Sequence, residues 1–181
     1  MRIIAGKYKG RNLLSPSDKG IRPTSSKIRE SVFNILANLG ILEGARVIDL
    51  CCGTGALGIE ALSRGAAKVV FIDGSNQHLK LAWTNICHLN EQEKSMMLRA
   101  AAENLPQAKE EFDLVFIDPP YFKDVASKAL SSLLHNGWLA KNSTIVIELS
   151  AKEDLIYSNE NFQEISIRKY GNTKIILLEL K

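Results

Sequence analysis

From residue 46 onward, short apolar runs alternate with stretches of helical periodicity. The apolar runs lie at residues 47–50, 69–72, 96–98, 114–117 and 145–147, and the third is the weakest. Between them, the pattern predicts helices at residues 56–64, 75–90, 103–109 and 123–135. Strands that are apolar on both faces and alternate with helices are typical of a parallel sheet covered on both sides. The pattern therefore predicts an α/β fold with a mostly parallel sheet.

The two ends of the chain depart from this alternation. Apolar residues recur at helical spacing from Ile28 to Leu39, which predicts a helix capped by Thr24, Ser25 or Ser26 and ended by Gly40. Residues 3–14 predict a hairpin with an irregular turn, and residues 165–178 predict a terminal antiparallel hairpin. We therefore expect a small N-terminal extension over residues 1–40 and one main domain over residues 41–181.

Composition limits the class of protein. The 181 residues are 45% hydrophobic and 24% charged, which is typical of folded globular chains and excludes disorder for most of the length. No apolar run approaches the roughly 20 residues that span a bilayer, and the first residues lack the apolar stretch of a secretory signal. Three cysteines are too few for a disulfide framework, and no Cys/His cluster suggests a metal site. The expectation is a reduced, cytoplasmic protein with no membrane contact and no metal.

The basic charge is concentrated at the N-terminal end. Residues 1–30 hold eight Lys and Arg against two acidic residues, a net charge of +6, although the whole chain carries only +3. Such a segment is either a solvated tail or an element that binds phosphates, because polyanions favour clustered basic side chains. Composition alone leaves both interpretations open.

A glycine-rich turn follows the first predicted strand. Gly53, Gly55 and Gly58 fit the G-x-G-x-x-G pattern of dinucleotide-binding turns, and Asp73 ends the next strand, where it suits the hydroxyls of a ribose. Asp49 precedes the first glycine by four residues and would repel the pyrophosphate of NAD. A carboxylate there instead suits the ammonium and sulfonium groups of S-adenosylmethionine (SAM). Cys51 and its neighbour Cys52 are interpreted as small residues that fill the turn.

A second signal ends the fourth predicted strand, at Asp118-Pro119-Pro120-Tyr121. Two consecutive prolines continue neither a sheet ladder nor a helix, so they fix the direction in which the chain leaves the strand. The Asp118 carboxylate and the following carbonyl then offer two acceptors at a fixed spacing, with an aromatic ring nearby. This arrangement suits a planar group that carries an amine. Both signals are expected at the carboxyl edge of the sheet, where open α/β folds bind ligands.

These motifs together resemble known methyltransferases. The order D-x-x-x-G-x-G is similar to motif I of class I SAM-dependent methyltransferases, and Asp-Pro-Pro-Tyr is similar to the motif of enzymes that methylate exocyclic amines. The opening Arg2-Ile-Ile-Ala-Gly, then Arg22-Pro-Thr24 and Arg29-Glu-Ser-Val-Phe-Asn, resembles the bacterial RsmD family of 16S rRNA guanine-N2 methyltransferases, as do residues 53–66 and 136–139. The resemblance covers nearly the whole chain.

The resemblance implies a Rossmann-like, seven-stranded sheet with an antiparallel last hairpin, SAM as cofactor, and 16S rRNA of the small ribosomal subunit or its assembly intermediates as partner. The catalytic residues it implies are Asp118, Pro119, Pro120 and Tyr121, which would hold the base. The cofactor-binding residues it implies are Asp49, Cys51, Gly53, Gly55, Asp73 and Gly74. The RNA-binding residues it implies are Arg2, Lys7, Lys9, Arg11, Arg22, Thr24 and Arg29. Many relatives carry Asp or Asn after the third strand for the adenine amine, whereas this chain has Ala100–Ala102 followed by Glu103.

Several alternatives stay open. Asp-Pro-Pro-Tyr is also compatible with an adenine-N6 methyltransferase that acts on DNA or on another rRNA. A protein from another class, a non-catalytic RNA-binding assembly factor, could keep the fold without the chemistry. An NAD-dependent enzyme would also need residues for hydride transfer, and no such set accompanies the glycines in this sequence. The expectation for the oligomeric state is a monomer.

Overall fold

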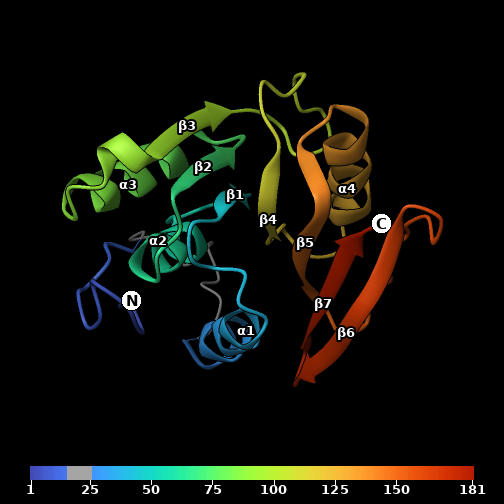
Figure 1. Cartoon of the computed structure of the whole chain (residues 1–181), viewed down its shortest axis with the longest axis horizontal. Helices are drawn as coiled ribbons and strands as arrows, with labels where there is room; N and C mark the ends of the chain where they lie inside the picture. The colour runs from blue at the N-terminus through green and yellow to red at the C-terminus, as the bar shows by residue number, and fades with distance from the viewer. Residues whose placement is uncertain (16–25) are drawn as a thin grey trace.

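A single seven-stranded sheet organises the chain. The computed structural model describes residues 1–15 and 26–181. The strands of the sheet lie in the order β3-β2-β1-β4-β5-β7-β6, with β1 to β5 parallel to one another and β7 antiparallel to both neighbours (Figure 1). The strands are β1 (Arg46–Leu50), β2 (Lys68–Asp73), β3 (Ser95–Arg99), β4 (Phe112–Ile117), β5 (Leu139–Ser150), β6 (Phe162–Tyr170) and β7 (Thr173–Leu180). The predicted parallel sheet and the terminal antiparallel hairpin are confirmed.

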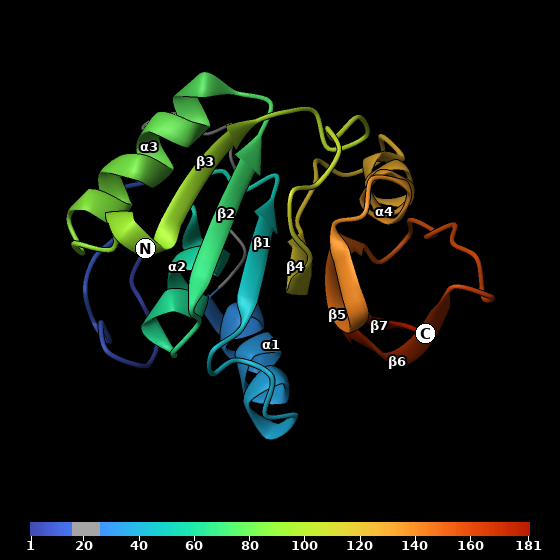
Figure 2. The ribbon, with the colours of Figure 1, turned by 45° about the horizontal axis from the view of Figure 1, so that its top comes forward.

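Helices cover both faces of this sheet (Figure 2). They are α1 (Ser26–Asn38), α2 (Ala56–Ser63), α3 (Asn76–Cys87) and α4 (Val125–His135), with a short 3₁₀ helix η1 (Gln92–Lys94) before β3. Apolar side chains of α1, α2 and α3 pack in one cluster against one face of the strands, and those of α4 pack in a second cluster against the other face. Successive residues of β1, β2 and β4 alternate between the two clusters, which explains why these strands are apolar throughout.

One predicted helix is wrong. Residues 103–109 form an irregular loop between β3 and β4 instead of a helix. Pro106 stands in the middle of this segment, where it would break a helix. Its carbonyl accepts a 2.8 Å hydrogen bond from the Trp138 indole, and the Leu105 amide donates to Ser132 Oγ at 2.9 Å. Contacts with α4 and its C-terminal turn thus satisfy backbone groups that a helix would have paired internally.

The N-terminal residues 1–15, here named the head, contain no strand. The expected hairpin is reduced to one antiparallel bridge between Arg2 and Asn12, with a backbone hydrogen bond from Ile3 N to the Arg11 carbonyl at 3.0 Å. The head lies along α2 in both views of the molecule (Figures 1 and 2). Ile3, Tyr8 and Leu13 are buried in the same cluster as α1 and α2.

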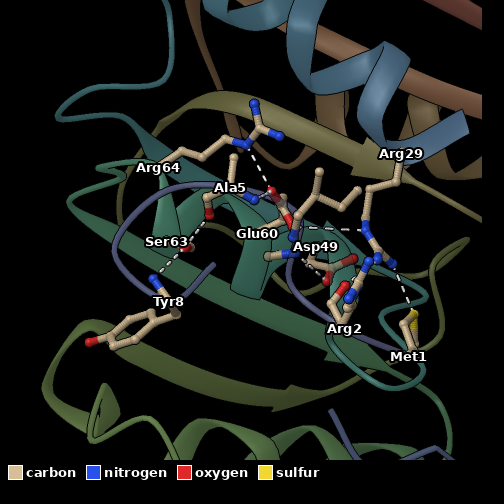
Figure 3. Close-up of polar contacts among 11 residues, drawn as sticks. Met1, Arg2, Ala5, Tyr8, Arg29, Asp49, Glu60, Ser63 and Arg64 are labelled. Carbon is tan, nitrogen blue, oxygen red and sulfur yellow. Dashed lines mark hydrogen bonds and ion pairs between the residues drawn. The ribbon is translucent and has the colours of Figure 1, made fainter. Parts of the chain in front are cut away.

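The head is fastened to α2 by buried polar contacts (Figure 3). The Glu60 carboxylate accepts hydrogen bonds from the Ile4 and Ala5 amides at 2.8 and 3.0 Å. Ser63 Oγ donates to the Ala5 carbonyl at 2.6 Å and accepts from the Tyr8 amide at 3.0 Å. A β-carbon on Gly6 would lie 1.8 Å from the Ser63 carbonyl oxygen, so only glycine allows this close approach. The division into residues 1–40 and 41–181 stays a prediction.

Among the described residues, no helix is long and apolar enough to cross a membrane. In the same part of the chain, no group of three or more His, Cys, Asp or Glu side chains could hold a metal ion.

Candidate active site

A cavity of about 640 Å³ opens at the carboxyl ends of β1, β2, β4 and β5. The glycine-rich turn and Asp73 line one side of it, and residues 118–121 line another. The two signals that lie 60 to 70 residues apart in the sequence therefore share one cavity. The strand order explains this, because β4 pairs directly with β1 and brings its carboxyl end beside the turn that follows β1.

The turn after β1 depends on a backbone that most residues avoid. Cys51, Gly53 and Gly55 have φ values of 62°, 53° and 77°, all in the left-handed region. Glycine adopts this conformation without strain. Gly53 lines the cavity, and a β-carbon on it would meet nothing within 4 Å, so the backbone there is open to a ligand. Gly55 instead starts α2 and faces Phe71 and Ala82, so its role is packing.

Asp49 is almost fully buried beneath this turn and lines the cavity. One oxygen of its carboxylate accepts a 2.8 Å hydrogen bond from the Gly58 amide in the first turn of α2. Burial raises the pKa of Asp49 to about 7. A positively charged ligand in the cavity would stabilise the ionised form, so the site fits a cation better than a pyrophosphate.

Asp73 ends β2 and organises the neighbouring wall. Its carboxylate accepts hydrogen bonds from the Gly53 amide at 3.1 Å and the Ser75 amide at 2.8 Å. The His78 ring nitrogen lies 3.1 Å from both carboxylate oxygens. Gly74 lines the cavity directly after Asp73, and His78 also lines it. Sequence analysis missed His78, although its position five residues after the strand-ending acid was a usable signal.

The two cysteines of the turn are held as neutral thiols. Burial raises the pKa of Cys51 to about 12, and burial raises the pKa of Cys52 further. Both thiols are unpaired, as is that of Cys87. Cys51 and Cys52 line the cavity as small side chains, which agrees with their interpretation as residues that fill the turn.

On the other side of the cavity, Asp118 follows β4. Its amide donates to the Leu50 carbonyl at 3.3 Å, which holds the exit of β4 against the end of β1. Pro119 is buried and Pro120 is exposed, and both line the cavity. Asp118 is half-buried, so its carboxylate lies at the cavity wall and not in the core.

Tyr121 is anchored at its hydroxyl. The hydroxyl donates to Glu148 Oε1 on β5 at 3.1 Å and lies 3.0 Å from Thr173 Oγ1 on β7. Burial, followed by the neighbouring Glu148 charge, raises the pKa of Tyr121, so the phenol stays neutral and keeps its proton for this bond. These contacts fix the ring at the cavity wall. Glu148 also lines the cavity and was not predicted, because no local motif marks a lone acid inside an apolar strand.

The loop after β3 forms a further wall, with Ala101, Ala102 and Glu103. The segment in which this chain has alanines where many relatives carry Asp or Asn therefore lies at the cavity. Glu103 is the polar side chain that this loop contributes to the cavity lining.

The predicted RNA-binding residues fall into three groups. Arg2, Lys7, Lys9 and Arg11 are exposed on the head. Lys7 is paired with Glu91 at 3.1 Å, and Arg11 packs over the Tyr8 ring. Arg22 and Thr24 lie outside the described residues. Ser25, which like Thr24 was a proposed cap of the first helix, lies outside them as well.

The prediction that Arg29 binds RNA is wrong. Its side chain is fully buried, so it cannot contact RNA. It donates to the Arg2 carbonyl at 2.7 Å and to the Met1 sulfur at 2.9 Å, and it pairs with Glu60 (Figure 3). Arg29 therefore holds the head in place. Sequence analysis could not separate this role from that of a surface arginine.

The fold and this cavity together define a class I, SAM-dependent methyltransferase. The model of the family described as Conserved hypothetical protein 95 matches residues 1–179. Ribosomal RNA small subunit methyltransferase D of Haemophilus influenzae is 36% identical over 160 residues, which cover 86% of this chain and 82% of the relative. The protein of the same name from Escherichia coli strain K12 is 34% identical over 155 residues, which cover 86% of this chain and 77% of the relative.

A solved structure agrees with these relatives. Escherichia coli yhhF superposes with a TM-score of 0.88 and 30% identity, covering 100% of this chain and 98% of that one. The chain belongs to the methyltransferase D (RsmD) family.

Proposed function

We propose that this protein transfers a methyl group from SAM to the exocyclic N2 of a guanine in 16S rRNA, within the small ribosomal subunit or an assembly intermediate. The observation that carries the proposal is the single cavity shared by Asp49, Asp73 and the segment from Asp118 to Tyr121. The names of the relatives, which act on small-subunit rRNA, support the choice of substrate class. We further propose that the protein acts as a monomer.

The β1–β2 side of the cavity fits SAM. Asp49 is a buried carboxylate whose pKa is raised to about 7 by burial, and a cationic ligand would offset that cost. Asp73 already accepts from the Gly53 and Ser75 amides and lies beside His78, so about one of the four acceptor positions of a carboxylate is left for a ribose hydroxyl. When bound, SAM supplies an electrophilic methyl group on a positively charged sulfur. At Gly53 and Gly74, which have no side chain, SAM could approach the protein backbone closely. Cys51 would contact SAM beside these glycines.

The β4 side fits an amine acceptor. The N2 lone pair of guanine is delocalised into the ring, so the amine is a weak nucleophile. The Asp118 carboxylate and the Pro119 carbonyl accept its two hydrogens and turn the lone pair toward the donor. Asp118 need not be a strong base, since the proton can leave N2 after the new carbon–nitrogen bond has formed. Positioning and electrostatic stabilisation then supply most of the acceleration.

The base must leave its stack to enter this cavity. The Tyr121 ring, held by Glu148 and Thr173, offers a stacking surface worth about 1–3 kcal/mol per base. The exposed cations Arg2, Lys9 and Arg11 of the head would contact phosphates, and Lys7 contributes less because it is paired with Glu91. We propose the same role for Arg22 and Thr24, which were assigned by resemblance alone.

The test is transfer of labelled methyl from SAM to small ribosomal subunits that lack the modification, with naked 16S rRNA and DNA in parallel. The expected product is N2-methylguanine at a single position, and the Asp118→Ala variant serves as the inactive control. Label in adenine or in DNA would support the proposed role of Asp118 but would show that the proposed substrate is wrong. No label on any nucleic acid, despite SAM binding, would contradict a catalytic function and favour an assembly factor.

A further inference from the structure

Glu148 is an acid in the cavity that the mechanism above does not use as a substrate ligand. It lies in β5, is 8% exposed and lines the same cavity as Asp118 and Tyr121. Its neighbours along the strand, Ile147 and Leu149, are buried in the apolar cluster under α4. An ionisable side chain at such a position is costly to bury, and its place at the ligand cavity indicates a role there.

The pairing of β4 with β5 brings Glu148 and Asp118 to corresponding positions at the cavity. Ile117, the last residue of β4, pairs with Ile147 of β5, so Asp118 directly after β4 and Glu148 within β5 each follow a residue of this last pair. Ile117 and Ile147 both face the α4 cluster. Because side chains alternate along a strand, Glu148 points to the opposite face of the sheet from Ile147.

Four acids occupy corresponding positions in or directly after four neighbouring strands. Asp73 and Asp49 belong to β2 and β1, Asp118 directly follows β4, Glu148 belongs to β5, and each of the four acids comes after a residue of the α4 cluster. All four line the cavity. The first two lie on the side assigned to SAM and the third faces the amine, so the fourth lies farthest from SAM, on the side of the base.

We propose that the Glu148 carboxylate is the specificity-determining acceptor for the N1–H of guanine, beside the Asp118 acceptor for N2. The inference rests on the proposed function and deepens it by naming the base. Guanine presents two adjacent donors, N1–H and the N2 amine, and two neighbouring carboxylates match them. Adenine has an acceptor at N1 beside its N6 amine, so a carboxylate there would repel it. A site built to accept a hydrogen bond rejects the analogue that lacks the donor.

The contact with Tyr121 is compatible with this role. The Tyr121 hydroxyl donates to Glu148 Oε1 at 3.1 Å, and a carboxylate accepts more than one hydrogen bond at a time. The same contact provides the competing explanation, in which Glu148 only fixes the Tyr121 ring. The two explanations differ in what they predict for a base other than guanine.

The test uses small subunits reconstituted with 16S rRNA whose target guanine, first mapped with the unaltered protein, is either retained or replaced by adenine. The readout is kcat/KM for methyl transfer to each, with the modified nucleoside identified. We expect the unaltered protein to prefer guanine strongly. Glu148→Gln can still accept from Tyr121 through its amide oxygen, but its amide can also donate to adenine N1. We therefore expect the guanine-to-adenine ratio to fall by about 10- to 100-fold in this variant.

Thr173→Val is the matched control, because it removes the other contact of the Tyr121 hydroxyl without changing the charge of the cavity. It should lower kcat/KM for both bases by the same factor and leave the ratio unchanged. If Glu148→Gln also lowers both values equally, Glu148 only positions Tyr121 and the inference is overturned. Failure of the proposed function is seen separately, because the unaltered protein would then label no guanine. Thermal unfolding of both variants confirms that they fold.

Discussion

The guanidinium Nε of Arg29 lies 3.9 Å from a carboxylate oxygen of Glu60, and both side chains are 1% exposed. Arg29 comes from α1 and Glu60 from α2, and both side chains hydrogen-bond to the backbone of the head (Figure 3). Arg64 adds a second cation on Glu60, at 2.8 Å. This buried cluster fixes the exposed cations of the head relative to the helix that begins at the glycine-rich turn.

Replacing Glu60 with alanine is expected to lower the free energy of unfolding by about 3–5 kcal/mol, because Arg29 is left buried without its partner. The Ile4 and Ala5 amides lose their acceptor as well. Urea denaturation measures the loss. Glu110→Ala is the matched control, since the pair of Glu110 with Lys68 is more than one-third exposed and is worth about 0–1 kcal/mol. Equal losses in the two variants would show that the cluster does not stabilise the fold.

Replacing Asp118 with alanine or asparagine is expected to lower kcat by about 10²–10³-fold, the cost of removing one well-placed polar group that stabilises a transition state. The affinity for SAM should stay unchanged, because SAM is assigned to the β1–β2 side of the cavity. Single-turnover kinetics and calorimetric SAM titration measure the two quantities. Asp113→Ala, at the opposite end of β4 and paired with Arg46, should leave both unchanged. Full activity without the Asp118 carboxylate would refute its assignment.

The affinity for SAM is expected to depend on pH through Asp49, whose pKa burial raises to about 7. Below this pH the carboxyl is protonated and loses its attraction for a cation, so affinity should fall by up to about tenfold per pH unit. Titrations between roughly pH 5.5 and 8.5 would follow this change. Asp49→Asn should bind more weakly at high pH, and the part of the pH dependence due to Asp49 should vanish. Parallel pH curves for the two proteins would argue against a contact between Asp49 and the cation.

The raised pKa of Asp49 also affects the stability of the ligand-free protein. The unfolded chain ionises Asp49 near the ordinary value of 3.8, whereas the folded chain retains the proton up to about pH 7. The folded state therefore binds more protons in this window, and stability falls as pH rises through it. Asp49→Asn should remove this part of the fall in denaturation experiments, and SAM should offset it in the unaltered protein.

Replacing Arg2, Lys9 and Arg11 together with glutamine is expected to weaken RNA binding and to flatten its salt dependence. Each lost phosphate contact lowers the slope of log K against log salt concentration by about 0.7–0.9. Lys7 is left intact, because its pair with Glu91 also holds the head. Arg168→Gln with Lys169→Gln, exposed on the edge strand β6, serves as the control. An unchanged slope in the head variant would make the head a purely structural element.

Much of the fold and the centre of the site were readable from the sequence. The alternation of apolar runs with helices predicted the parallel strands, because a strand covered on both faces must be apolar throughout. Gly53 and Asp118-Pro119-Pro120-Tyr121, which line the cavity, could be singled out because each depends on local backbone geometry. A left-handed turn favours glycine, and a double proline cannot continue the hydrogen-bonded ladder of a strand.

Only the tertiary structure decided the roles that depend on partners distant in sequence. Arginine is usually a surface residue, but Arg29 is buried beside Glu60 and the head, and these contacts make its role structural. Residues 103–109 were predicted to be helical but form a loop whose backbone hydrogen-bonds to α4 and to the turn after it. Glu148 and Asp118, 30 residues apart in the sequence, became neighbours through the pairing of β4 with β5. Local sequence favours a backbone conformation for most segments, whereas burial and charge pairing arise only when the segments pack together.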